Sequence, residues 1–434
     1  MPTEIPTVSA NSADNDPSRR PGISRNVLLL GWVSLFNDAA SEMLYPIMPL
    51  FLIATLGASP ALLGLIDGMA EGIGSALRWL GGALSDRFGR RKPFVLAGYL
   101  LSAVSKPIMG LSAFILGWPT FMFGRCADRL GKSVRNAARD ALLAASTSAQ
   151  TRGRAFGFQR AMDTCGAVIG PLTTLGVIIL LTSAHTAFSA NWNGGDAHST
   201  TLQNLPLKGL FFIALIPGLL AVTCVLAVRE IPPDRQKPTK TGGKPPPIFQ
   251  SYPASLWRVL VAAFVFSLGN SSDTFLILRS SQIGLSFGFI ILAYAMYNVV
   301  YAAGSEPLGR LSDRIGRKPL LVTGWAIYAA VYAGFAVFRA AWAPWLLLGI
   351  YGLYQAMTDG VTSALISDVV PDAKRAGAIG LYYTTVGLGQ LTASLLAGAV
   401  YNVFILHGQI MLTFALGSGC ALAGIPLLIA APIR

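Results

Sequence analysis

Charged residues are scarce in this chain. Asp, Glu, Lys and Arg make up 12% of its 434 residues, whereas apolar residues make up 53%. A soluble domain carries about 25% charged residues, so we do not expect a soluble enzyme or a soluble binding domain. Apolar runs of about 20 residues recur along the chain, and this is the length that an α-helix needs to cross a bilayer.

Cysteine and histidine are also rare. The chain has three histidines, and its four cysteines all lie in apolar segments without metal-ligand spacing (Cys126, Cys165, Cys224 and Cys420). Such cysteines favour packing roles over disulfides or a zinc site. Since no nucleophile–base pair stands out either, we expect no enzyme activity, no cofactor and no metal.

Basic residues outnumber acidic ones, which gives a formal net charge of +13. This excess does not indicate nucleic-acid binding, because most Lys and Arg residues lie in short clusters between apolar segments. Such clusters are typical of the cytoplasmic loops of membrane proteins. We therefore predict a multi-pass protein of the cell (inner) membrane with both termini in the cytoplasm. The polar residues 1–26 are expected to form a disordered cytoplasmic tail.

The apolar runs predict twelve membrane-spanning helices, six in each half. A membrane β-barrel would alternate apolar and polar residues instead. In the first half the spans are expected near 27–54, 61–83, 93–116, 118–145, 154–182 and 206–229. In the second half they are expected near 255–278, 284–307, 319–338, 343–368, 376–402 and 407–431. The expected domains are thus bundles at 27–230 and 254–434, joined by a Pro-rich, basic cytoplasmic linker at 231–253.

A charged decapeptide occurs twice, as GALSDRFGRR at 82–91 and GRLSDRIGRK at 309–318, with seven identical positions. Each copy lies between two apolar spans, which indicates a duplicated membrane protein. The pattern resembles the signature that follows the second and eighth spans in the major facilitator superfamily. The resemblance implies a conformational switch formed by Gly82, Asp86, Arg87, Gly89, Arg90, Gly309, Asp313, Arg314, Gly316 and Arg317.

This resemblance covers residues 27–431 and implies the fold of that superfamily. The fold is an all-α membrane protein with two pseudo-symmetric six-helix bundles and a substrate site between them near the midplane. It also implies a secondary transporter that works by alternating access. We expect a monomer whose partners are a small-molecule substrate, protons and the lipid bilayer.

The fourth and fifth spans resemble the antiporter branch of the superfamily. Arg125 matches an arginine of the fourth span that is associated with proton transfer, although Asp128 replaces the usual Gln. The fifth span carries Gly157, Gly166 and Gly170-Pro171 at antiporter-like spacing, but it lacks the closing glycine pair. The two patterns imply export by proton exchange.

Charges inside the predicted spans are the remaining signal, because an ionised side chain in a bilayer is costly unless it is paired or hydrated. The candidates for proton coupling are Asp38, Glu42, Asp67, Glu71, Arg125 and Asp128. The candidates for the substrate cavity are Arg129, Lys132, Arg160, Asp163, Asp273, Tyr294, Asn298, Tyr382 and Gln390. The second half is poorer in charge, with Asp273, Glu306 and Asp359 as its central acids.

Two functions are consistent with these residues. The first is a proton-coupled exporter of a small organic compound, either a drug or a metabolite. The alternative is a permease for an anionic metabolite or a metal chelate, which would be bound by the basic stripe of the fourth span. A receptor that transports nothing is disfavoured because both copies of the decapeptide are present.

Overall fold

The structure is a computed structural model that describes residues 24–77, 91–147, 152–190, 205–231, 252–370, 375–405 and 411–432. Five predicted switch residues lie outside this part of the chain: Gly82, Asp86, Arg87, Gly89 and Arg90. The predicted tail up to residue 23 and most of the predicted linker lie outside it as well. Every regular element among the described residues is helical.

Helices occupy all twelve predicted ranges. The first half contains α1 (Arg25–Glu42), α2 (Met48–Leu50), the π-helix η1 (Phe51–Thr55), α3 (Pro60–Ala76), α5 (Lys92–Leu111), α6 (Trp118–Ala145), α7 (Arg152–Leu181), α8 (Ala184–Ser189), α10 (Leu207–Ile213) and α11 (Leu215–Ala227). The second half contains α12 (Ala254–Ser267), α13 (Thr274–Gln282), α14 (Phe287–Ile315), α15 (Arg317–Val337), α16 (Ala343–Val369), α17 (Arg375–Ile405) and α18 (Met411–Ala430).

Three of the predicted spans are interrupted. The sixth is interrupted only at Ala214, between α10 and α11, whereas the first and the seventh are broken over several residues. In the first span, α1 ends at Glu42 and α2 begins at Met48, because Pro46 has no backbone N–H to continue the helix. In the seventh span the break covers residues 268–273, where Gly269 is followed by Asn, Ser, Ser and Asp. These residues favour turns over helix. The second break places Asp273 directly before α13.

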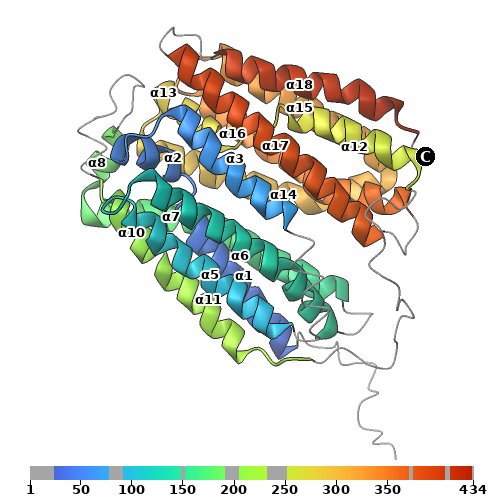
Figure 1. The fold of residues 1–434 in the computed structure, drawn as a ribbon, viewed down its shortest axis with the longest axis horizontal. Coiled ribbons are helices and arrows are strands. Elements are labelled where there is room, and N and C mark those ends of the chain that lie inside the picture. The colour runs from blue at the N-terminus through green and yellow to red at the C-terminus, as the bar shows by residue number, and fades with distance from the viewer. Residues whose placement is uncertain are drawn as a thin grey trace, which may run out of the picture.

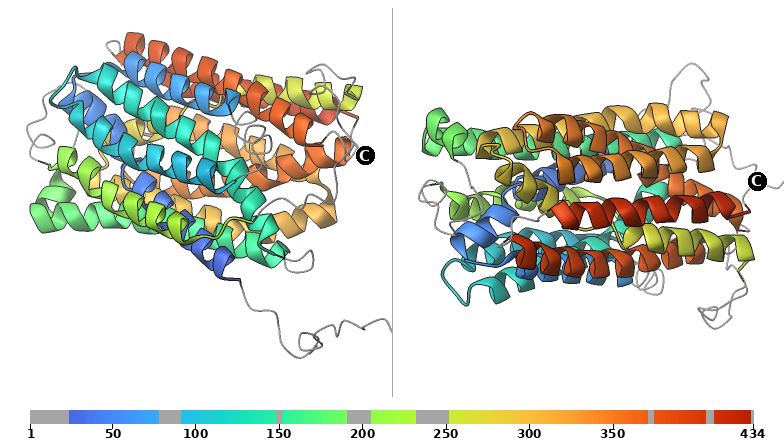
Figure 2. Two further views of the ribbon diagram at one scale, coloured as in Figure 1. Left: turned by 60° about the horizontal axis from the view of Figure 1, so that its bottom comes forward. Right: turned by 90° about the horizontal axis from the view of Figure 1, so that it is seen from above.

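The helices form two groups that correspond to the two halves of the chain, except that α3 of the first half lies beside α17 of the second (Figure 1). In the first half α1 packs on α7 and α11, and α5 packs on α6, whereas in the second half α16 packs on α14 and α15. The halves meet where α3 packs on α17 and where α7 packs on α14. The groups converge near α2, α8 and α13 and diverge toward the opposite end, and the long helices run roughly parallel (Figures 1 and 2).

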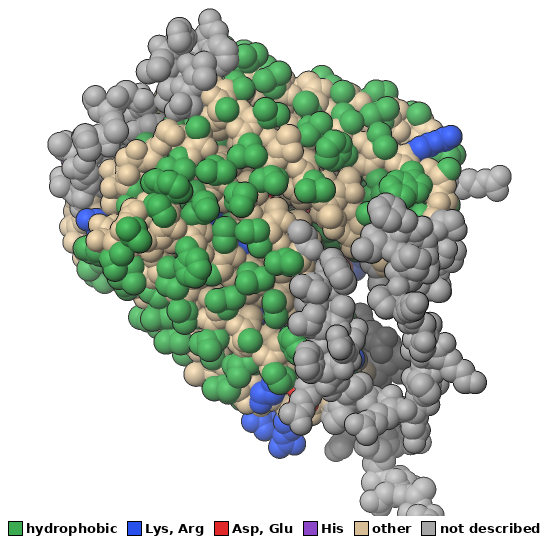
Figure 3. Space-filling view, viewed as in Figure 1, with side chains coloured by type: hydrophobic (Ala, Val, Ile, Leu, Met, Phe, Trp, Pro, Cys, Tyr) green, Lys and Arg blue, Asp and Glu red, His purple; other side chains and the backbone are tan. Residues whose placement is uncertain are grey.

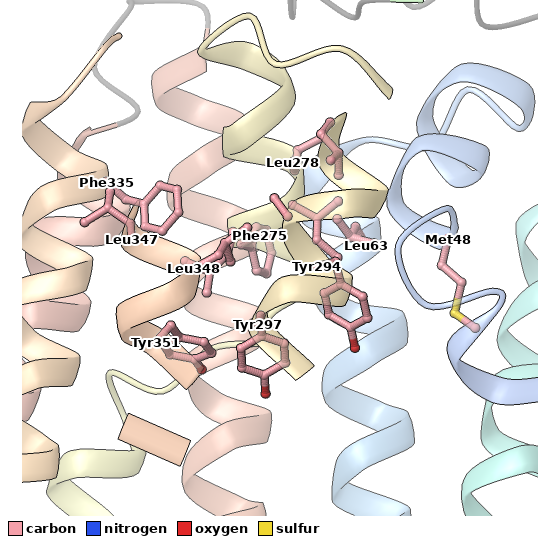
Figure 4. Packing of buried hydrophobic residues seen from close by; sticks show 14 of the residues in the cluster. Met48, Leu63, Phe275, Leu278, Tyr294, Tyr297, Phe335, Leu347, Leu348 and Tyr351 are labelled. Carbon is pink, nitrogen blue, oxygen red and sulfur yellow. The ribbon is translucent and has the colours of Figure 1, made fainter. Parts of the chain in front are cut away.

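We call the two ends of the molecule the α8 end and the basic end. The basic end is the one where α5 and α15 begin, with Arg91, Lys92, Arg317 and Lys318. Buried apolar side chains from both halves form one cluster, and its members Met48, Leu63, Phe275 and Leu278 lie toward the α8 end (Figure 4). This apolar packing closes the interface between the halves at that end.

Glycines permit the close approach of several helices. A Cβ atom at Gly170 would lie 2.7 Å from the carbonyl oxygen of Ala39, and one at Gly166 would collide with the carbonyl oxygen of Leu35. The fifth-span motif therefore brings α7 against α1 at these two glycines. Gly157 differs, because a Cβ atom there would meet nothing within 4 Å.

The outer surface is apolar along the helices. Apolar side chains cover the face shown in Figure 3, and most of the visible Lys and Arg side chains lie near helix ends. Six helices in the described part of the chain are long and apolar enough to cross a membrane: Lys92–Leu111, Arg154–Leu181, Leu207–Ala227, Phe287–Ile315, Arg317–Val337 and Met411–Ala430. An exposed apolar surface of this kind is what contact with lipid requires.

Candidate functional site

A cavity with two adjoining lobes lies between the halves. We call the first the charged lobe, with a volume of about 330 Å³, and the second the tyrosine lobe, with a volume of about 270 Å³. Tyr45, Glu71, Asp273 and Gln355 line both lobes, so the lobes are neighbours. Each lobe is close to the lower limit of about 300–1,000 Å³ for a small-molecule site.

The lobes collect the residues that the sequence suggested. Of the nine predicted cavity residues, seven line the charged lobe, namely Arg129, Lys132, Arg160, Asp163, Asp273, Tyr294 and Asn298. The other two, Tyr382 and Gln390, line the tyrosine lobe. Five predicted proton-coupling residues also line the charged lobe: Asp38, Glu42, Glu71, Arg125 and Asp128. Their roles in binding and coupling stay predictions.

The sixth residue of that group, Asp67, is buried beside the cavity. Its carboxylate lies 3.2 Å from Nε of Arg125, and both side chains are almost fully buried. It also accepts hydrogen bonds from the hydroxyls of Ser272 (2.8 Å) and Thr274 (2.7 Å). Three donors therefore satisfy this carboxylate, which ties α3 to α6 and to the break in the seventh span.

Two further ion pairs line the charged lobe. Arg129 lies 2.5 Å from Glu71, and Lys106 lies 3.6 Å from Asp128. Asp128 also accepts a hydrogen bond of 2.5 Å from the hydroxyl of Ser102. The sequence analysis missed Lys106, although a lone lysine inside the otherwise apolar run 93–116 is itself a signal. Asp128 stands where the superfamily pattern has Gln, and Lys106 supplies the cation that this carboxylate needs.

Asp38 and Glu42 on α1 have no such ion pair. Within the described residues, no Lys or Arg nitrogen lies within 4.0 Å of either carboxylate. Glu42 instead accepts a hydrogen bond of 2.7 Å from the hydroxyl of Tyr294 on α14, in the other half. The ring of Tyr294 stacks on Tyr45, with 5.4 Å between centroids. Glu42 thus contacts the second half through a neutral donor.

Tyrosines form the boundary between the cavity and the apolar cluster at the α8 end. The hydroxyls of Tyr294, Tyr297 and Tyr351 point away from Leu278 and Phe335 (Figure 4). The hydroxyl of Tyr351 donates a hydrogen bond of 2.6 Å to Asp273, which lies just before α13. The helix break therefore supplies the cavity with a carboxylate from the second half.

A second contact between the halves lies toward the basic end. Arg160 on α7 donates to Asp359 on α16 at 2.7 Å, and Tyr301 on α14 donates to the same oxygen at 2.5 Å. Arg160 and Tyr301 line the charged lobe and also a third pocket, which Asp313 and Arg317 line as well. This three-residue cluster lies where the charged lobe adjoins the third pocket, and the side chains of Arg160 and Asp359 are half-exposed.

The second decapeptide copy forms the turn between α14 and α15. Gly316 has φ of 93°, a left-handed conformation that glycine adopts at low cost. Arg317 lies 3.1 Å from Asp313 and 2.6 Å from Asp368 on α16. Gly309 has no close neighbour, since a Cβ atom there would meet nothing within 4 Å. In this copy the arginine holds the turn against the neighbouring helix.

The expectation that Glu306 is a central acid is wrong. Its side chain is 74% exposed and pairs with Arg310 at 2.5 Å. The reason is its position in the last part of α14, which continues to Ile315 at the basic end, where the side chain faces outward and lines neither lobe. The other two acids of that group, Asp273 and Asp359, do line the tyrosine lobe.

Comparisons with known proteins agree with this architecture. A family model described as Major Facilitator Superfamily matches residues 30–279 and 259–432. An uncharacterised MFS-type transporter of Methanocaldococcus jannaschii is 36% identical over 388 residues, which cover 88% of this chain and 89% of that protein. The multidrug resistance protein MdtH of Salmonella paratyphi C is 31% identical over 130 residues, 30% of this chain and 31% of its own.

A solved structure shares the fold. The crystal structure of a D-xylose-proton symporter superposes with a TM-score of 0.73 at 16% identity, covering 94% of this chain and 97% of that one. At this identity the likeness concerns the fold alone.

Proposed function

The chain belongs to the major facilitator superfamily and is a membrane transporter rather than an enzyme, and from that premise we propose that it exports a small organic compound in exchange for protons. The observation that carries this proposal is the contact of Glu42 with Tyr294 between the two halves. A carboxylate accepts a stronger hydrogen bond when it is ionised than when it is neutral. A proton on Glu42 would therefore weaken one of the contacts that hold the halves together.

Asp38 supports the same role. It lines the charged lobe one turn before Glu42 on α1, and within the described residues it has no ion pair. A carboxylate without a fixed cation can take up a proton without leaving an unpaired buried cation behind. By contrast, Asp67, Glu71 and Asp128 each have a basic partner. We assign proton exchange to Asp38 and Glu42 and a supporting role to the paired residues, including Arg125.

Two observations support export as the direction. The first is the partial similarity to a multidrug resistance protein, which covers 30% of this chain. The second is the packing of Gly166 and Gly170 of the antiporter-like motif against α1, the helix that carries Asp38 and Glu42. A proton-linked change in α1 can reach α7 directly through this contact.

We further propose that the protein lies in the cell (inner) membrane as a monomer, with the basic end and both termini in the cytoplasm. The clusters of Lys and Arg at that end support this orientation. The apolar cluster closes the α8 end, and the third pocket lies at the basic end. The structure then corresponds to a state whose route to the cavity is on the cytoplasmic side.

Transport in membrane vesicles tests the proposal. A substrate is first identified by comparing the compounds retained by cells with and without the protein. Its movement is then measured in inverted vesicles under an imposed proton gradient. We expect Asp38→Asn and Glu42→Gln to lose gradient-driven transport while substrate counterflow without a gradient continues. Glu306→Gln, on an exposed acid, is the matched control, and full gradient-driven transport by both cavity variants would refute the assignment.

A further inference from the structure

The cations of the charged lobe fall into two groups. Four of them have an acidic partner within 4.0 Å: Lys106, Arg125, Arg129 and Arg160. Two of them, Lys132 and Arg135 on α6, have no such partner among the described residues. Of the four α6 cations in this lobe, Arg125 and Arg129 are therefore already paired. Lys132 and Arg135 have no ion pair among the described residues, and the nearby acids Asp38 and Glu42 of the same lobe have none either.

Arg135 is the more unusual of the two. Its side chain lines the charged lobe, yet the residue is only 3% exposed, and its Nε and Nη1 atoms have no hydrogen-bond partner. Leaving guanidinium donors unsatisfied in a buried site costs free energy. The guanidinium lies over the ring of Tyr99, 4.5 Å from its centroid, which orients the side chain but satisfies none of these N–H groups.

The position of Arg135 is fixed by the packing of α5 on α6. A Cβ atom at Gly98 would lie 2.6 Å from Cβ of Arg135, so the two helices are in close contact at this point. Lys132 lies three residues earlier, on the same face of α6. Two cations on one helix face that lines a cavity, one of them with unsatisfied N–H groups, form the kind of site that binds an oxyanion.

The tyrosine lobe offers a different surface next to this site. Phe266 stacks on Trp325 with 4.4 Å between centroids, and Tyr351, Tyr354 and Tyr382 line the same lobe. Aromatic walls of this kind favour a planar or cyclic body. The lobe adjoins the charged lobe through Tyr45 and Asp273.

We propose that Lys132 and Arg135 bind the oxyanion of the transported compound while the tyrosine lobe takes its ring. The substrate class is then an aromatic or cyclic organic anion, such as a carboxylate or a phosphonate. This inference rests on the proposed transport function but does not depend on its direction or on the coupling ion. The sequence alone left open a permease that binds an anion along the basic stripe of the fourth span. The inference restricts anion binding to two residues of that stripe.

Ligand binding to the purified full-length chain tests the proposal. The probes are benzoate and phenylphosphonate, with benzamide and benzylamine as matched neutral and cationic compounds. Binding is followed by intrinsic tryptophan fluorescence and by thermal stabilisation in nanodiscs of neutral phosphatidylcholine. Nanodiscs that contain anionic phosphatidylglycerol form a second arm, which shows whether a lipid headgroup takes the same site.

We expect the anionic probes to bind more tightly than benzamide or benzylamine. Lys132→Gln and Arg135→Gln should weaken anion binding by about tenfold or more, because each removes a charge-assisted hydrogen bond. Arg135→Lys keeps a cation and should retain most of the binding, which separates loss of charge from misfolding. Arg310→Gln removes an exposed positive charge at the basic end and should bind as the unmodified protein does.

Three outcomes would overturn the inference. They are binding of benzamide as tight as that of the anions, anion binding unchanged in both glutamine variants, and no response to any anionic probe. Weaker binding of the probes in phosphatidylglycerol than in phosphatidylcholine would assign the site to a lipid headgroup instead, and would also overturn it. If the chain binds the anions but exports no compound, the proposed export is wrong and the anion site is still supported.

Discussion

The two halves of the chain line the shared cavity with different chemistry. All the cations of the charged lobe come from the first half: Lys106, Arg125, Arg129, Lys132, Arg135 and Arg160. The tyrosine lobe is lined mainly by the second half, with aromatic rings, hydroxyls and amides. Among its described residues, the second half contributes only Asp273 and Asp359 as acids to these lobes. Duplication thus preserved the helices and the charged turn but not the chemistry of the cavity walls.

This difference is also seen in the contacts between the two halves. In two of the contacts between them, an acid of the first half accepts from a neutral hydroxyl of the second: Asp67 from Ser272 and Thr274, and Glu42 from Tyr294. A neutral hydrogen bond contributes about 1 kcal/mol, whereas breaking a buried ion pair costs about 3–5 kcal/mol. Halves that must separate during transport are better joined by hydroxyls. Among the described residues, the buried pairs Arg125–Asp67 and Lys106–Asp128 lie inside the first half, whereas the pair between the halves, Arg160–Asp359, is half-exposed and so easier to break.

The strongest test of this comparison is the buried pair in the first half. Arg125→Gln leaves Asp67 with its two hydroxyl donors but without a cation, and both side chains are almost fully buried. We expect a loss of about 3–5 kcal/mol in the free energy of unfolding, seen as a large fall in thermal stability and in folded yield. The double variant Arg125→Gln with Asp67→Asn removes both charges and should recover part of the loss. A single variant as stable as the unmodified chain would show that the pair does not fix α3 on α6.

The contact between α1 and α7 gives a second, smaller effect. Gly166→Leu would force a side chain against the backbone of Leu35, so we expect a loss of about 1–3 kcal/mol from overpacking. Gly157→Ala is the control in the same helix, because its Cβ atom meets nothing within 4 Å. Alanine is a better helix former than glycine, so this control should not lower thermal stability. Equal losses in the two variants would contradict the packing role of Gly166.

The second half should respond more weakly than the charged pair of the first. Tyr351→Phe removes the hydroxyl that donates to Asp273 at 2.6 Å but keeps the ring. The expected loss is about 1 kcal/mol, the net contribution of one hydrogen bond, measured as a shift in thermal unfolding. Tyr351→Leu also removes the ring contacts with Tyr328 and Tyr354 and should cost more. A loss as large as that of Arg125→Gln would remove the contrast between the halves.

Much of this architecture could be predicted from the sequence, for a physical reason. Apolar runs long enough to span a bilayer leave little choice but helices. Charged side chains inside such runs must find partners or water, so Arg125, Lys132 and Asp38 stood out before their positions were known. Lys106 carried the same signal and was overlooked.

Other features depend on contacts between distant parts of the chain. Helical periodicity shows which residues share a face, but not that Arg125 pairs with Asp67 while Arg135 has no ion pair within the part of the chain that the structure describes. Those pairings follow from how α3, α5 and α6 pack. The break before Asp273 had a local signal in the residues Gly269 to Ser272, yet the apolar runs on both sides favoured one continuous span.

The smallest expected effect concerns Glu306, the acid of the second half that lies outside the cavity. Glu306→Gln removes a charge that is 74% exposed and paired only with Arg310 at the basic end. Exposed ion pairs contribute little to stability, so thermal unfolding and transport should stay at the level of the unmodified chain. Asp273→Asn, which neutralises a carboxylate inside the cavity, should change transport in the same assay. If Glu306→Gln abolished transport instead, an acidic residue of the second half would act outside the cavity. The different cavity linings would then not explain the contrast between the halves.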